Sequence, residues 1–152
     1  MNKPFIIALN LAVFILLTTA VIPVAGQEQT GTINVEIVGL RNDSGHVLLA
    51  LYNSAQGFPE NRSKVFASAS ATIDHGLAFI KFNNVPYGIY AISVLHDENN
   101  NGDMDYGFMS IPTEGYGYSQ NVRTGMTPPS FADCSFTLDS ASKNITIRMI
   151  YF

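Results

Sequence analysis

Residues 83–95 read Asn83-Asn84-Val85-Pro86-Tyr87-Gly88-Ile89-Tyr90-Ala91-Ile92-Ser93-Val94-Leu95, which is a turn followed by a strand. In the turn, proline fixes one backbone dihedral and glycine permits the conformation that follows it. Beyond the turn, Tyr90, Ile92 and Val94 fall on one side of the chain, because successive side chains of a strand point to opposite faces. The stretch therefore indicates a β-domain whose strands end in turn residues.

The same alternation recurs on both sides of this stretch. Besides 89–95, strands are predicted at residues 33–38, 46–52, 64–73, 77–82, 134–138 and 145–150. We expect the first two to form a hairpin through the turn residues 42–45. No segment of the sequence has sustained helical spacing of apolar residues. About seven short strands separated by turns predict an all-β, antiparallel β-sandwich.

Residues 106–130 do not follow this rhythm. A long connection without strand alternation is uncommon in a compact domain and is usually functional or mobile. The segment is rich in aromatic residues, which disordered segments lack. We therefore predict one long ordered loop, folded over one end of the sandwich beside the Asp/Asn cluster described below.

The N-terminus has the layout of a secretory signal peptide. Lys3 precedes an apolar run over residues 5–21, and the small residues of Pro23-Val24-Ala25-Gly26 follow. This pattern predicts a signal peptide over residues 1–26 and a single domain over 27–152, exported to the periplasm, the outer surface or the medium. The alternative is a retained membrane anchor, since the apolar run is nearly long enough to span a bilayer.

The charge balance and the cysteine content narrow the classes of partner. The chain has 8 Lys and Arg against 12 Asp and Glu, a formal net charge of −4, which disfavours nucleic acid and anionic membrane surfaces and favours cations. No stable membrane insertion is expected once the signal peptide is cleaved. The single cysteine, Cys134, excludes an internal disulfide. Alternation places Cys134 on the same strand face as Phe136 and Leu138, so a buried apolar residue is expected, with a reactive thiol as the alternative.

Residues 97–105 carry the clearest chemical signal. They read Asp97-Glu98-Asn99-Asn100-Asn101-Gly102-Asp103-Met104-Asp105, with oxygen-bearing side chains at alternate positions and glycine at the sixth. A tight loop of this kind can fold its oxygens around one hard cation. The predicted Ca²⁺ ligands are the side chains of Asp97, Asn99, Asn101 and Asp105 and the carbonyl of Asp103.

The predicted calcium loop is incomplete. Position twelve is Phe108 instead of the bidentate glutamate that closes such loops, so Glu114 or water must supply the remaining oxygens. We therefore expect weak Ca²⁺ binding, with a Kd on the order of 10⁻⁴ to 10⁻³ M. The alternative is a polar turn in which Asn and Asp side chains only cap backbone amides.

Other polar and aromatic residues allow two further hypotheses. Tyr116 and Tyr118, with Tyr106, are predicted ligand-binding residues whose rings could stack on a glycan, the alternative being loop packing. A small hydrolase with Cys134 as nucleophile and His96 as base is conceivable, but no catalytic signature or short zinc spacing occurs in the sequence. We therefore predict no catalytic residues, and an extracytoplasmic protein or glycan as the partner.

Four ordered motifs resemble a known family. Residues 85–94, 96–105, 115–121 and 128–131 are similar to the bacterial secreted proteins grouped as domain of unknown function 2141 (DUF2141). The resemblance implies an exported bacterial domain without an established activity. The proline-glycine turn also resembles prealbumin-like sandwiches, including carboxypeptidase regulatory-like and collagen-adhesin B-type repeats, some of which hold calcium in similar loops. This second likeness is one of fold and loop, and it transfers no catalytic residue. We expect the domain to be a calcium-stabilised extracytoplasmic binding or adhesion module.

Overall fold

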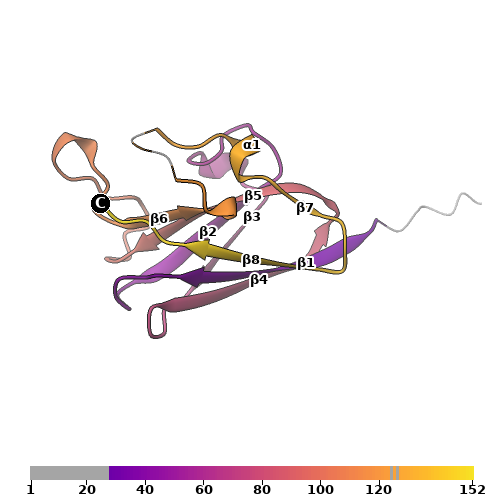
Figure 1. Cartoon of the computed structure of the whole chain (residues 1–152), viewed down its shortest axis with the longest axis horizontal. Coiled ribbons are helices and arrows are strands. Elements are labelled where there is room, and N and C mark those ends of the chain that lie inside the picture. The colour runs from indigo at the N-terminus through magenta and orange to yellow at the C-terminus, as the bar shows by residue number, and fades with distance from the viewer. Residues whose placement is uncertain (1–27, 124, 126) are drawn as a thin grey trace, which may run out of the picture.

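Two β-sheets pack face to face in this protein (Figure 1). The computed structural model describes residues 28–123, 125 and 127–152, so the predicted signal peptide over residues 1–26 lies outside the described residues. The smaller sheet has the order β4-β1-β8, formed by β4 (Leu77–Pro86), β1 (Thr30–Val38) and β8 (Ser142–Arg148). The larger sheet has the order β3-β2-β5-β6, formed by β3 (Ala67–Ala71), β2 (His46–Tyr52), β5 (Gly88–Asp97) and β6 (Gly115–Tyr118), and β7 (Phe136–Leu138) pairs with the start of β5. The predicted all-β sandwich is confirmed.

One strand pair departs from the predicted antiparallel pattern. β8 runs parallel to β1, with Thr32 opposite Ser142, whereas the other pairs among the described strands are antiparallel. The chain reaches this position by passing Gly31, where an added Cβ would lie 2.4 Å from the carbonyl oxygen of Ser140. Glycine at this position therefore lets the last strand of the domain lie directly beside the first.

The predicted hairpin between the first two strands is wrong. β1 pairs with β4 and β8, whereas β2 pairs with β3 and β5, so the two strands lie in opposite sheets. The connection over residues 39–45 carries the chain across the sandwich and ends at Gly45, which has a φ of +68°. An added Cβ there would lie 1.9 Å from the carbonyl oxygen of Asp97. Alternation identifies the buried face of a strand but not its partner, which explains the error.

The turn predicted over residues 83–88 is shorter in the structure. Asn83 and Asn84 belong to β4. β4 has a bulge at these residues, seen as a shift of its register against β1 between Gly31 and Ile33. Asn84 has a left-handed φ of 55°, a conformation that asparagine tolerates better than most residues. The chain changes direction only around Tyr87, where it crosses from the smaller sheet into β5.

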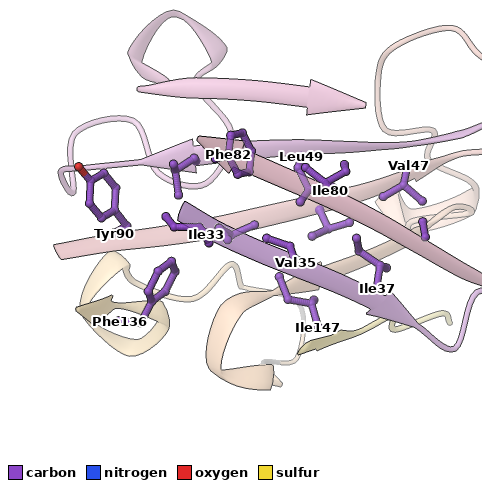
Figure 2. Close-up of a cluster of buried hydrophobic side chains, with 14 of the residues drawn as sticks. Ile33, Val35, Ile37, Val47, Leu49, Ile80, Phe82, Tyr90, Phe136 and Ile147 are labelled. Atoms are coloured by element: carbon purple, nitrogen blue, oxygen red, sulfur yellow. The ribbon is translucent and has the colours of Figure 1, made fainter. Parts of the chain in front are cut away.

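The hydrophobic core lies between the two sheets (Figure 2). β1 contributes Ile33, Val35 and Ile37, each at most 1% exposed, as the alternation predicts. They pack against buried side chains from both sheets, which include Val47, Leu49, Ile80, Phe82, Tyr90, Phe136 and Ile147. Burying one such side chain contributes roughly 1.5–3 kcal/mol relative to exposure. This core fixes the strand ends from which the loops extend.

The described residues of the segment 106–130 do not form a single loop. Within it, β6 pairs antiparallel with β5, and 3-10 turns span Phe108–Ser110 and Ser119–Asn121; a further one spans Arg62–Lys64. Gly115 is required in β6, since an added Cβ would lie 2.3 Å from the ring of Tyr151. The predicted place of this segment beside the Asp/Asn cluster is confirmed, because the Thr113 amide donates to the Asp105 carbonyl at 2.9 Å.

Cys134 ends a helical turn instead of beginning a strand. α1 (Phe131–Cys134) is preceded by its N-cap residue Ser130, whose side chain forms a reciprocal capping box with Asp133. The predicted burial of Cys134 is confirmed, because its side chain is 0% exposed. Among the described residues, no helix has the length and apolar character that crossing a bilayer requires.

Candidate functional site

The candidate loop begins where β5 ends, at Asp97. This residue is 2% exposed, and its two carboxylate oxygens accept the backbone amides of Asn101 at 3.1 Å and Gly102 at 2.8 Å. Gly102 has a φ of +85°, so it makes the turn that the sequence assigns to the sixth position. The rigid strand end thereby places one carboxylate at the inside of the loop.

Two carboxamides and a second carboxylate complete this cluster. Asn99 and Asn101 donate to the carboxylate of Asp105, at 2.6 Å and 3.0 Å. Their side-chain oxygens accept the backbone amides of Asn101 and Asp103, at 3.0 Å and 2.8 Å. Four of the five predicted ligands, Asp97, Asn99, Asn101 and Asp105, therefore belong to one hydrogen-bonded network, which we call the Asp/Asn cluster.

Asp103, the fifth predicted ligand, directs its side chain away from the Asp/Asn cluster. The carboxylate lies 3.4 Å from the guanidinium of Arg62, and both side chains are largely exposed. Arg62 also donates to the carbonyl of Gly102. The Asp103 side chain is therefore not a ligand in this arrangement, and only its backbone carbonyl is left as the predicted ligand.

Glu114 connects the two ends of the loop, and we call this contact the Glu114 brace. It is 4% exposed, and its two carboxylate oxygens accept the backbone amides of Glu98 at 2.8 Å and Asp105 at 3.2 Å. One side chain thus ties together both ends of the loop. The sequence suggests Glu114 as a closing oxygen donor, and the structure brings it to the loop with both oxygens engaged by backbone amides.

The chemistry of the Asp/Asn cluster is that of hard oxygen donors. It contains two carboxylates and two carboxamides, and within the described residues no three His, Cys, Asp or Glu side chains gather as a metal-binding group. The cluster therefore differs from zinc sites, which are rich in nitrogen and sulfur ligands. The arrangement suits an oxygen-seeking cation, and it is equally a network of capped backbone amides.

Arg41 and Asn42 hold the outer side of the loop. Glu98 lies 2.6 Å from the Arg41 guanidinium and accepts the Asn42 amide at 2.9 Å. Burial acts to raise the pKa of Glu98, but these two partners outweigh burial and leave that pKa below its ordinary value. Neither Arg41 nor Arg62 was expected at the loop, because each arrives from a distant segment and only the three-dimensional structure reveals the contact.

His96 is a structural residue of this end of the sandwich. It is 0% exposed, its Nε2 lies 2.9 Å from the carbonyl of Ser44, and its Nδ1 lies 2.7 Å from the hydroxyl of Tyr151. A carbonyl only accepts, so Nε2 donates to Ser44, and the Tyr151 hydroxyl is the partner of Nδ1. Both ring nitrogens are therefore engaged away from the Asp/Asn cluster.

Two of the loop tyrosines pack into the protein. Tyr116 is 8% exposed, and the ring of Tyr118 lies 5.8 Å from that of Tyr116 and 6.2 Å from that of Phe58. Burial raises the pKa of Tyr118 well above its ordinary value. Tyr106, by contrast, is 58% exposed. Of the three tyrosines, Tyr116 is buried, Tyr118 is half-buried and Tyr106 is the most exposed.

Comparisons with known proteins give one finding. A family model described as an uncharacterized protein conserved in bacteria (DUF2141) matches residues 35–146. This range begins within β1, ends within β8 and contains the whole Asp/Asn cluster. Searches of curated proteins and of solved structures find no match.

Proposed function

The chain belongs to the DUF2141 family of uncharacterized bacterial proteins, and we propose that it is an exported, non-enzymatic β-sandwich module that binds Ca²⁺ weakly and serves in binding or adhesion. One observation carries the calcium proposal. Two carboxylates and two carboxamides, from Asp97, Asn99, Asn101 and Asp105, belong to a single network on a rigid strand end. Oxygen donors of this type in a flexible loop suit Ca²⁺.

The same network explains why the binding would be weak. In their present orientation, Asn99 and Asn101 offer nitrogen to Asp105 and oxygen to backbone amides. A half-turn of each carboxamide presents oxygen beside Asp105, at the cost of those backbone hydrogen bonds. With Glu114 already engaged, the Asp103 carbonyl and water are left to complete the six to eight oxygens that Ca²⁺ takes.

Burial of the only cysteine supports a non-enzymatic role. Cys134 is 0% exposed, and burial raises its thiol pKa to about 11. A thiolate, not a thiol, is the reactive species, so Cys134 is a poor nucleophile near neutral pH. The neighbouring capping box and the β7 strand give this residue a packing role instead.

Calorimetric titration with CaCl₂ tests the proposal, with MgCl₂ as a second cation. We expect heat with Ca²⁺ at millimolar concentration and a rise in the melting temperature, because a ligand that binds only the native state stabilises it. Asp105→Asn should abolish both signals. Asp103→Asn, which removes the same charge from an exposed side chain, should retain them.

Equal behaviour of the two variants would refute the Asp/Asn cluster as the calcium site. Absence of heat and of a thermal shift in the wild-type protein would instead establish the capped polar turn. Mg²⁺ should give a weaker response, since it demands regular octahedral geometry and loses its water reluctantly.

A further inference from the structure

The residues that follow the Asp/Asn cluster expose an unusual apolar surface. Residues 106–113 contain no charged residue, and we call them the apolar tip. Within it, Tyr106 is 58% exposed, Phe108 86%, Met109 69% and Ile111 40%. Large exposed apolar side chains that gather in one place mark an interaction site.

The apolar side chains of the tip are exposed because the backbone of the tip has a defined conformation. The apolar tip is a hairpin, closed by hydrogen bonds from the Thr113 amide to the Asp105 carbonyl at 2.9 Å and from the Gly107 amide to the Ile111 carbonyl at 2.8 Å. At its turn, Met109 and Ser110 have φ values of 57° and 58°, which residues other than glycine rarely adopt. In Figure 1 the tip stands off the end of the sandwich, where its salmon-to-orange ribbon coils at the upper left.

The size and shape of the apolar tip favour a lipid surface over a protein partner. Four side chains on a protruding hairpin offer on the order of 400 Å², whereas a specific protein interface needs about 800 Å² from each partner. A membrane interface requires no matching surface and accepts protruding aromatic and aliphatic side chains at headgroup depth. We propose that the apolar tip docks reversibly into a phospholipid surface when Ca²⁺ occupies the adjacent loop.

Charge explains why the docking would need the cation. The acidic side chains of Asp103 and Asp105 lie beside the tip, and the chain as a whole has a formal net charge of −4, so both oppose an anionic membrane. A divalent cation in the loop neutralises the two carboxylates of Asp97 and Asp105, which weakens the repulsion, and it can share its coordination with lipid phosphates. This calcium dependence rests on the proposed function, whereas insertion of the apolar side chains does not.

Vesicle co-sedimentation of residues 27–152 tests the inference, since the described part of this segment holds both sheets and the whole core. The probes are phosphatidylcholine vesicles with and without phosphatidylglycerol, in CaCl₂ or in EDTA. We expect the wild-type protein to pellet with anionic vesicles in CaCl₂. Phe108→Ser with Met109→Ser should lower the partition coefficient at least roughly tenfold, because each large apolar side chain contributes about that factor.

The matched control is Phe79→Ser, which changes an equally apolar side chain, 65% exposed, in β4 of the smaller sheet. It should leave the partitioning unchanged, and an equal loss in both variants would refute the docking role of the tip. A calorimetric calcium titration without vesicles separates the two proposals. If Ca²⁺ gives heat but the protein does not bind vesicles, membrane docking is refuted and the calcium proposal stands. If the tip-dependent vesicle binding persists in EDTA, docking is supported and its dependence on calcium is refuted. Concentration-dependent self-association that the tip variant abolishes, without vesicle binding, would assign the tip to a protein contact and overturn the inference.

Discussion

Replacing Glu114 with glutamine tests the brace beneath the Asp/Asn cluster. The carboxylate is 4% exposed and accepts one backbone amide on each oxygen, from Glu98 and from Asp105. Glutamine keeps one acceptor oxygen and turns an amide group toward the other N–H. One charge-assisted hydrogen bond is therefore lost, and a buried donor is left facing another donor.

The expected cost of Glu114→Gln is about 2–3 kcal/mol, because leaving a buried donor unsatisfied costs about 1–3 kcal/mol and the cost is higher where the lost partner is charged. For a domain with a stability of about 5–15 kcal/mol, a loss of this size is easily measured. Urea unfolding followed by circular dichroism measures it, in EDTA so that calcium does not contribute. The slope of the free energy against urea should stay unchanged.

Glu60→Gln is the matched control, since it makes the same chemical change at an exposed glutamate. Its effect should stay within about 0.5 kcal/mol, as for most surface substitutions. If the two variants unfold at the same urea concentration, Glu114 does not hold the loop ends together and the reasoning fails.

Two further predictions concern titratable groups. The pKa of Glu98 is lowered in the folded protein, so the unfolded chain binds the Glu98 proton more readily. The contacts of Glu98 with Arg41 and Asn42 therefore stabilise the fold fully above the ordinary pKa of 4.5. This stabilisation is lost as the pH falls through the lower pKa of the folded state. The difference in melting temperature between wild type and Glu98→Gln should therefore shrink below pH 4.5, and a constant difference would contradict the ion pair as described. Cys134, with a pKa raised to about 11, should react with a thiol reagent near neutral pH only as fast as the protein unfolds, and immediately in urea; immediate labelling of the native protein would show that the thiol is accessible.

Much of the fold could be predicted because burial leaves a local signature. The alternation of Ile33, Val35 and Ile37 identifies a strand and its buried face, and the structure confirms both. Partner choice leaves no such signature, so the first two strands were expected in one hairpin but lie in opposite sheets. The sequence does not predict β6, because Gly115, which admits the Tyr151 ring, and Gly117, which admits Ile147, replace the apolar residues by which strands are recognised.

The candidate site divides along the same line. Local spacing suffices to bring Asp97, Asn99, Asn101 and Asp105 together, since the tight turn at Gly102 does most of that work. The brace from Glu114 was suggested, but its two contacts depend on where a second segment returns. Solvent exposure also depends on the tertiary structure. That Tyr116 is buried and Phe108 exposed follows from the path of the hairpin and not from residue type.

The parallel pairing of β1 with β8 has a consequence for biosynthesis. β1 stays without one of its two neighbours until β8 has been synthesised, because Thr32 pairs with Ser142. Contacts between segments so far apart in the sequence form slowly, as the entropy of closing such a large loop must be overcome first. Until β8 is made, β1 has only β4 beside it, so the smaller sheet of the sandwich stays incomplete during synthesis.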